Sequence, residues 1–232
     1  MRNIDIGLES IDKIYHIADV HVRNVKRHRE YRSVFKRLYS YIKKTRTPNS
    51  VIYVAGDIVH AKTDMSPELV AVVSDFFKNL ADLAPTLIIT GNHDCNLNNS
   101  YRLDALSPIV KALNHQRLHY LKDNGIYCIS GVHFNVMSVY NKPTEYITAD
   151  KFDGDFKIAL HHGSVHNAST DAGFTLSNTH VTTNIFKGHD LVLLGDIHKP
   201  QYLNEEKTIA YAGSLIQQNH GEALGHGIMV WD

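Results

Sequence analysis

The chain of 232 residues is 43% hydrophobic and 21% charged, the balance of an ordinary globular protein. It has no apolar run of about 18 residues and no signal-peptide core, so we expect neither a membrane span nor secretion. With 24 basic and 24 acidic residues the net charge is zero, and total charge gives no argument for nucleic acid. Cys95 and Cys128 form neither a metal-binding pair nor a disulfide framework, which predicts a reducing compartment, the cytoplasm or the nucleus.

The first half of the chain predicts strands that alternate with helices. Apolar runs bounded by glycine, proline or polar residues are typical of buried strands, here at residues 13–18, 51–55 and 86–90. Apolar residues at helical spacing predict helices over residues 30–44, 69–80 and 103–113. Ser66 and Pro67 mark the start of the second helix, as a capping hydroxyl and a first-turn proline. A strand–helix pair occurs three times, which indicates an α/β fold.

The second half of the chain is richer in strands. Residues 118–121, 125–130 and 133–140 predict consecutive short strands, which suggests an antiparallel or mixed second sheet. Further strands are predicted at residues 156–160, 190–194, 207–212 and 227–231, and residues 163–180 read as a surface loop. No linker or repeat divides the chain, so we expect one domain over residues 1–232.

Polar side chains follow five of the predicted strands at the point where each strand ends. In open α/β sheets, ligands bind outside the carboxyl ends of the strands, so these clusters can converge on one rim. Any single pair is more often a turn, but five of them together are hard to explain as an accident of structure. The clusters are Asp19 with His21, Asp57 with His60, Asn92 with His93 and Asp94, His161 with His162, and Asp196 with His198.

The number of donors predicts more than one metal ion, because seven oxygen or nitrogen ligands exceed the roughly four that one zinc ion takes. Two ions about 3.5–4 Å apart, bridged by one carboxylate, would use all seven. Carboxylate, amide and imidazole without thiolate favour Mn²⁺, with Fe²⁺, Zn²⁺ or Mg²⁺ as alternatives. The candidate ligands are Asp19, His21, Asp57, Asn92, one histidine of the 161–162 pair, Asp196 and His198.

The order of these motifs resembles the calcineurin-like metallophosphoesterases: Asp-x-His, Gly-Asp, Gly-Asn-His-Asp, His-Gly and Gly-x-x-His. Within that superfamily the chain resembles the SbcD-type nuclease subunit of the double-strand-break repair nuclease–ATPase complexes. Residues 56–60, 195–201 and 211–219 carry this narrower likeness. The resemblance implies a sandwich of two mixed sheets flanked by helices in an α/β/β/α arrangement. It also implies an SMC-like ATPase partner and a homodimer.

The resemblance implies a role for each polar residue at the strand ends. Asp57 would bridge the two ions; one site would be completed by Asp19, His21 and His198, and the other by Asn92, Asp196 and one histidine of the pair. His-Gly spacing favours His162 over His161. His93 would protonate the leaving oxygen, Asp94 would orient His93, and His60 would position the scissile phosphate.

Two departures from the family pattern affect these expectations. Asp196 stands where the family has a histidine, which predicts a changed metal affinity or preference rather than a lost site. Family members usually continue into a DNA-capping domain and an ATPase-binding segment, and we expect this chain of 232 residues to lack both.

A basic stretch follows the first cluster, with ten lysines and arginines between Arg23 and Arg46 against one acid, Glu30. The plain interpretation is the solvated face of a helix. The alternative is a surface that contacts the phosphate backbone, in which Arg23, Lys26 and Arg27 guide DNA to the site.

The function expected from the sequence is two-metal-dependent phosphodiester hydrolysis, with DNA as substrate, by an exonuclease or endonuclease of repair or replication. The alternative is a phosphatase or small-molecule phosphodiesterase, since a fold and its metals do not fix the substrate. A third hypothesis, a non-catalytic scaffold with a decayed site, conflicts with a donor at every ligand position.

Overall fold

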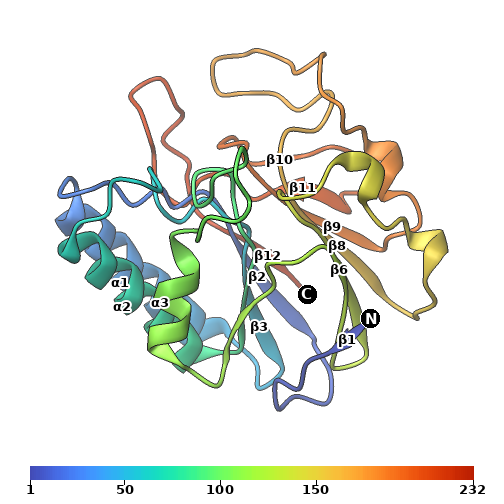
Figure 1. The fold of residues 1–232 in the computed structure, drawn as a ribbon, viewed down its shortest axis with the longest axis horizontal. Helices are drawn as coiled ribbons and strands as arrows, with labels where there is room; N and C mark the ends of the chain where they lie inside the picture. The colour runs from blue at the N-terminus through green and yellow to red at the C-terminus, as the bar shows by residue number, and fades with distance from the viewer.

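Two β-sheets packed face to face form the centre of the computed structural model, which describes residues 1–232 in full (Figure 1). The five-stranded sheet has the order β12-β2-β3-β4-β5, and the seven-stranded sheet has the order β1-β6-β7-β8-β9-β11-β10. This arrangement confirms the α/β fold with two mixed sheets flanked by helices. No helix is long and apolar enough to cross a membrane.

The five-stranded sheet comes from the first half of the chain and from its last strand. Its elements are β2 (Lys13–Ile17), α1 (His28–Thr45), β3 (Ser50–Val54), α2 (Pro67–Leu83), β4 (Thr86–Ile88), α3 (Leu106–Leu113), β5 (Leu118–Tyr120) and β12 (Met229–Trp231). Strands β2 to β5 run parallel, and β12 is antiparallel to β2. Parallel strands end at the same edge of a sheet, so the polar residues after β2, β3 and β4 come together.

The seven-stranded sheet comes mainly from the second half of the chain. Its strands are β1 (Arg2–Asn3), β6 (Gly125–Ile129), β7 (Val132–Met137), β8 (Lys157–His162), β9 (Leu191–Gly195), β10 (Gln201–Tyr202) and β11 (Ile209–Tyr211). Strands β7, β8 and β9 run parallel, whereas the β6–β7 and β10–β11 pairs are antiparallel. The outer face of this sheet is covered by the 163–190 segment and by the short turns η1 (Pro143–Glu145), η2 (Ala149–Lys151) and η3 (Thr183–Phe186).

Two expectations about the elements were wrong. We expected residues 118–121 to belong to the second sheet, but β5 pairs in parallel with β4, because α3 returns the chain to the edge of the first sheet. The third helix begins at Leu106 rather than at residue 103, since Asp104 accepts hydrogen bonds from the backbone N–H groups of Leu106 and Ser107 and so caps the helix.

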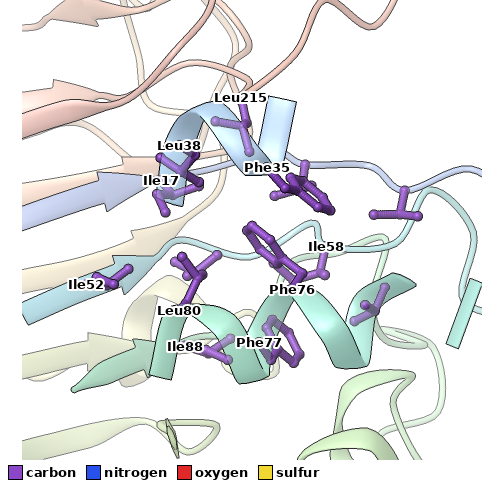
Figure 2. Close-up of a cluster of buried hydrophobic side chains, with 14 of the residues drawn as sticks. Ile17, Phe35, Leu38, Ile52, Ile58, Phe76, Phe77, Leu80, Ile88 and Leu215 are labelled. Atoms are coloured by element: carbon purple, nitrogen blue, oxygen red, sulfur yellow. The ribbon is translucent and has the colours of Figure 1, made fainter. Parts of the chain in front are cut away.

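Side chains along the strands of the first sheet point alternately to its two faces, and each face packs into a separate hydrophobic core. Ile52 and Val54 of β3 face the helices, while Val51 and Tyr53 face the second sheet. On the helix side, Phe35 of α1 lies against Phe76 of α2, with ring centroids 4.3 Å apart (Figure 2). Packing on both faces holds this sheet, and with it the edge at which the polar residues lie, in place.

Candidate metal centre

Loops from five strands meet at one edge of the sandwich, and the structure brings all seven candidate ligands into one cluster. Asp19 and His21 follow β2, Asp57 follows β3, Asn92 follows β4, His162 ends β8, and Asp196 and His198 follow β9. The two sheets are joined here, because the backbone N–H of Asp196 donates to both carboxylate oxygens of Asp19 at 3.1 Å.

Four of these ligands have a left-handed backbone, which side-chain-bearing residues rarely adopt. The φ angles are 51° at Asp19, 47° at His21, 52° at Asp57 and 103° at Asp196. Such conformations cost about 1–3 kcal/mol each and persist only where the surroundings enforce them. The His21 N–H, for example, donates to the Asp57 carbonyl at 2.9 Å. Strain collected at one cluster of donors indicates a functional site rather than a set of turns.

Asp57 lies at the centre of the cluster and is almost fully buried. Its Oδ2 is 3.5 Å from His21 Nε2 on one side and 3.4 Å from His162 Nε2 on the other. Its Oδ1 accepts a hydrogen bond from the His93 N–H at 2.8 Å. Burial favours a higher pKa for Asp57, but the charge and hydrogen bond of His162 hold it below its usual value. The shared Oδ2 gives Asp57 the geometry of a bridging ligand.

The first group of donors lies beside Asp57 and contains Asp19, His21 and His198. The Nε2 atoms of His21 and His198 are 3.2 Å apart, and Asp19 Oδ1 is 4.0 Å from His21 Nε2. Burial, helped by the neighbouring imidazoles and opposed by the charge of Asp57, lowers the pKa of His21 to about 3, so this ring is neutral. Burial, with Asp57 and Asp196 nearby, raises the pKa of Asp19 well above its usual value. A cation would relieve this cost.

The second group of donors contains His162, Asn92 and Asp196. His162 Nε2 is 2.9 Å from Asn92 Oδ1 and 4.0 Å from Asp196 Oδ1. The His162 Nδ1–H donates to the Ala55 carbonyl at 2.6 Å, which leaves Nε2 to face the cluster. Despite the opposing effect of burial, Asp57, Asp19 and Asp196 raise the pKa of His162 well above its usual value.

The separations between donors fit divalent ions. Two donors at about 2.1 Å from one ion lie about 3.0 Å apart at a right angle, about 3.4 Å at a tetrahedral angle and about 4.2 Å on opposite sides. The separations within the cluster are 2.9, 3.2, 3.4, 3.5 and 4.0 Å. Oxygen and nitrogen donors without sulfur suit Mn²⁺, Fe²⁺, Zn²⁺ or Mg²⁺. The residues present therefore fit two divalent cations.

The two adjacent histidines of β8 point to opposite faces of the sheet, as neighbours in a strand must. His162 enters the cluster, whereas His161 faces the outer core, where it packs near Tyr146 and Phe186. His161 Nδ1 donates to the Met137 carbonyl at 3.1 Å. The structure therefore places His162, and not His161, among the candidate metal donors.

Asp94 makes no hydrogen bond to the ring of His93, contrary to our expectation. Its Oδ1 accepts from the N–H groups of Ile58 and Val59 at 2.9 and 3.0 Å, and its Oδ2 accepts from Gly91 N–H at 2.9 Å. Asp94 thus fastens the loop after β4 to the loop after β3. The His93 ring is oriented instead by the His60 carbonyl, which accepts from Nδ1 at 2.7 Å.

A cavity of about 230 Å³ opens over the cluster, and both His60 and His93 line it. Because His93 Nδ1 donates to the His60 carbonyl, Nε2 is the ring nitrogen that this hydrogen bond leaves free. Burial lowers the pKa of His60, as does the nearby positive charge of Arg23. A neutral His60 ring retains one N–H that can donate to a bound oxygen.

The predicted basic residues lie beside this cavity. Arg23 lines it and also lines an adjoining hollow of about 500 Å³, together with Lys26 and Arg27. The Arg23 guanidinium donates to the Gln218 carbonyl at 3.2 Å, and its buried Nε has no partner. Arg27 is instead engaged by Glu30 through two hydrogen bonds of 2.7 Å. Arg23 and Lys26 are therefore the cations not held in an ion pair here.

One residue beside the cluster escaped the sequence analysis. Glu222 Oε1 accepts from His198 Nδ1 at 2.8 Å, and its side chain is 4% exposed. It lies within the loop between β11 and β12 and does not directly follow a strand. The motif over residues 211–219 stops just short of Glu222, and it was the only signal nearby.

Comparisons with known proteins agree with this geometry. The sequence model of a family described as calcineurin-like phosphoesterase matches residues 12–200. The chain is also 49% identical over 240 residues to a protein of Acanthamoeba polyphaga mimivirus named "Uncharacterized protein R555". That alignment covers 98% of this chain and 18% of the viral protein, so the chain spans less than a fifth of its relative's length.

Proposed function

The chain belongs to the calcineurin-like phosphoesterase family, whose members hydrolyse phosphoesters with metal ions, and we propose that this protein cleaves phosphodiester bonds of DNA. The observation that carries the proposal is the continuity between the donor cluster and the basic hollow. The cavity over the cluster and that hollow share Arg23, Gln218 and Asn219. A phosphate at the cluster would therefore have neighbouring phosphates next to Arg23 and Lys26.

Two divalent cations, when bound to the cluster, supply Lewis-acid polarisation of the phosphate and an acidified water molecule. Asp19, His21 and His198 would hold one cation, Asn92, His162 and Asp196 the other, and Asp57 both. We propose Mn²⁺ as the metal, because carboxylate-rich sites suit it.

The chain's own side chains would handle the proton and the phosphate. His93 has Nδ1 fixed on the His60 carbonyl at 2.7 Å, so protonated Nε2 is the group that donates to the leaving sugar oxygen. His60 lines the same cavity and, with a neutral ring, would donate one N–H to a phosphate oxygen. Asp94 keeps both residues in place through the backbone of their loops.

A second candidate is a phosphatase or a phosphodiesterase of small molecules on the same scaffold. The Arg27–Glu30 pair favours it, because the pair removes one of three cations from the surface that would bind DNA. The net charge of zero also provides no general attraction for a polyanion.

Hydrolysis assays distinguish these two functions. End-labelled linear DNA and bis-p-nitrophenyl phosphate are incubated separately with the protein and Mn²⁺, with His93→Ala as the control variant. DNA degradation that requires both Mn²⁺ and His93 supports the nuclease. Cleavage of the small diester alongside intact DNA would move the function to the second candidate.

The resemblance supports three further proposals about assembly and context. We propose a role in DNA repair or replication, an SMC-like ATPase as partner, and a homodimer. Size-exclusion chromatography with light scattering tests the dimer, and a single-protomer mass at micromolar concentration would contradict it.

A further inference from the structure

The loop between β11 and β12 carries a buried carboxylate that belongs to no strand end. Glu222 Oε1 accepts from His198 Nδ1 and from the side-chain amide of Asn219, both at 2.8 Å. Its Oε2 accepts from the backbone N–H of Gln218 at 2.6 Å. A buried carboxylate that accepts three hydrogen bonds is an organised acceptor site rather than a stray surface charge.

The hydrogen bond from His198 to Glu222 determines which ring nitrogen of His198 carries the hydrogen. A carboxylate can only accept, so His198 Nδ1 carries a hydrogen and Nε2 is the ring nitrogen left to bind an ion. That Nε2 is the atom 3.2 Å from His21 Nε2 in the first donor group. A carboxylate that accepts from the far nitrogen of a ligating imidazole fixes the tautomer and strengthens the ligand.

We propose that Glu222 is a positioning residue of the metal centre, which acts through His198 on one of the two ions. The inference rests on the metal centre of the proposed function. It adds a residue that is not itself a metal ligand. It also implies that the binding of one ion depends on this loop, whereas the binding of the other does not.

The anchoring of the loop supports this role. Leu215 N–H donates to the Ala18 carbonyl at 3.1 Å, directly before Asp19, so the loop is held beside one metal donor and reaches a second, His198, through Glu222. Gln218 is held between Glu222, through its N–H, and Arg23, through its carbonyl. Glu222 therefore ties the first donor group to the wall of the cavity.

Titration of the metal-free protein with Mn²⁺, followed by electron paramagnetic resonance, tests the proposal without measuring activity. The variants are Glu222→Ala and Glu222→Gln, and the matched control is Asp171→Asn. Asp171 lines a neighbouring hollow with Glu222, but the one hydrogen bond of its side chain is from Ala223 N–H at 3.5 Å. Thermal unfolding of each metal-free variant checks that it folds.

We expect Glu222→Ala to lower the affinity for one of the two Mn²⁺ ions about 10- to 100-fold, which is the usual effect of removing a hydrogen-bond partner of a metal ligand. The affinity for the other ion should not change. Glu222→Gln keeps an acceptor for His198 Nδ1 and is expected to restore part of the affinity. If Glu222→Ala does not fold, weaker binding of one ion by Glu222→Gln than by wild type decides the question. Equal affinities in wild type and the folded variants, even with lower thermal stability, would reduce Glu222 to a loop contact. No Mn²⁺ binding by wild type would instead refute the metal centre itself.

Discussion

The pH dependence of metal binding follows from the surroundings of His162. Its Nδ1–H is held by the Ala55 carbonyl at 2.6 Å, and its Nε2 faces Asn92 Oδ1 at 2.9 Å and Asp57 Oδ2 at 3.4 Å. Because acceptors meet both nitrogens, the metal-free ring is an imidazolium, and nearby carboxylates raise its pKa well above the usual value. A cation needs the Nε2 lone pair, so it must displace that proton.

The proton on His162 sets the pH dependence of the ion that this ring holds, while Asp19, with its raised pKa, is a second possible source of a proton. His21 contributes none, because burial lowers its pKa to about 3 and its ring is already neutral. Below the pKa of His162, the affinity of the ion that His162 holds should rise about tenfold per pH unit, or about 1.4 kcal/mol. The stability of the metal-free protein depends on pH in the opposite direction. The raised pKa stabilises the fold below about pH 6.5, and that stability is lost as the pH rises through the folded-state pKa.

Isothermal titration with Mn²⁺ at pH 7, in two buffers of different ionisation enthalpy, counts the protons released. The expected result is at least one proton released for two ions bound, with the affinity of one ion rising as the pH rises. His161→Ala is the matched control, since His161 lies on the opposite face of β8 and should leave the proton count unchanged. Binding that releases no proton and does not vary with pH would refute the imidazolium.

Three other variants test separate parts of the site. Asp94→Ala leaves three backbone N–H groups without their acceptor, at about 1–3 kcal/mol each, so urea unfolding should show a loss of at least about 3 kcal/mol. Arg23→Ala with Lys26→Ala should weaken DNA binding and reduce the slope of log affinity against log salt by about 1–2, measured by fluorescence anisotropy. Gly91→Ala should abolish Mn²⁺ binding, because its Cβ would overlap the bridging carboxylate, whereas Gly225→Ala meets nothing within 4 Å and should bind normally.

The convergence of the donors could be predicted because it depends on strand direction. Short apolar runs before Asp19, Asp57 and Asn92 indicated parallel strands, and such strands end at one edge. The strand ends at His162 and Asp196 come from the other sheet, and their approach follows from sheet packing. The choice between His161 and His162 also needed the structure, because either phase of alternation fits the sequence.

Other features depend on contacts between segments that sequence periodicity does not encode. Glu222 reaches His198 from an irregular loop, so no apolar run marks its position. An aspartate at position 94 could either orient the neighbouring histidine or fasten two loops, so the sequence does not distinguish these roles. The three backbone N–H groups that donate to Asp94 show that it fastens two loops. Strand β5 was assigned to the wrong sheet because its short apolar run fits either edge.

The proposed bridging of two ions by Asp57 is tested most directly by a crystal structure of the Mn²⁺-loaded protein with anomalous difference maps. We predict two peaks about 3.5–4 Å apart on either side of Asp57 Oδ2. One should contact His21 and His198, and the other Asn92 and His162. A single peak, or two peaks that do not share Asp57, would contradict the account.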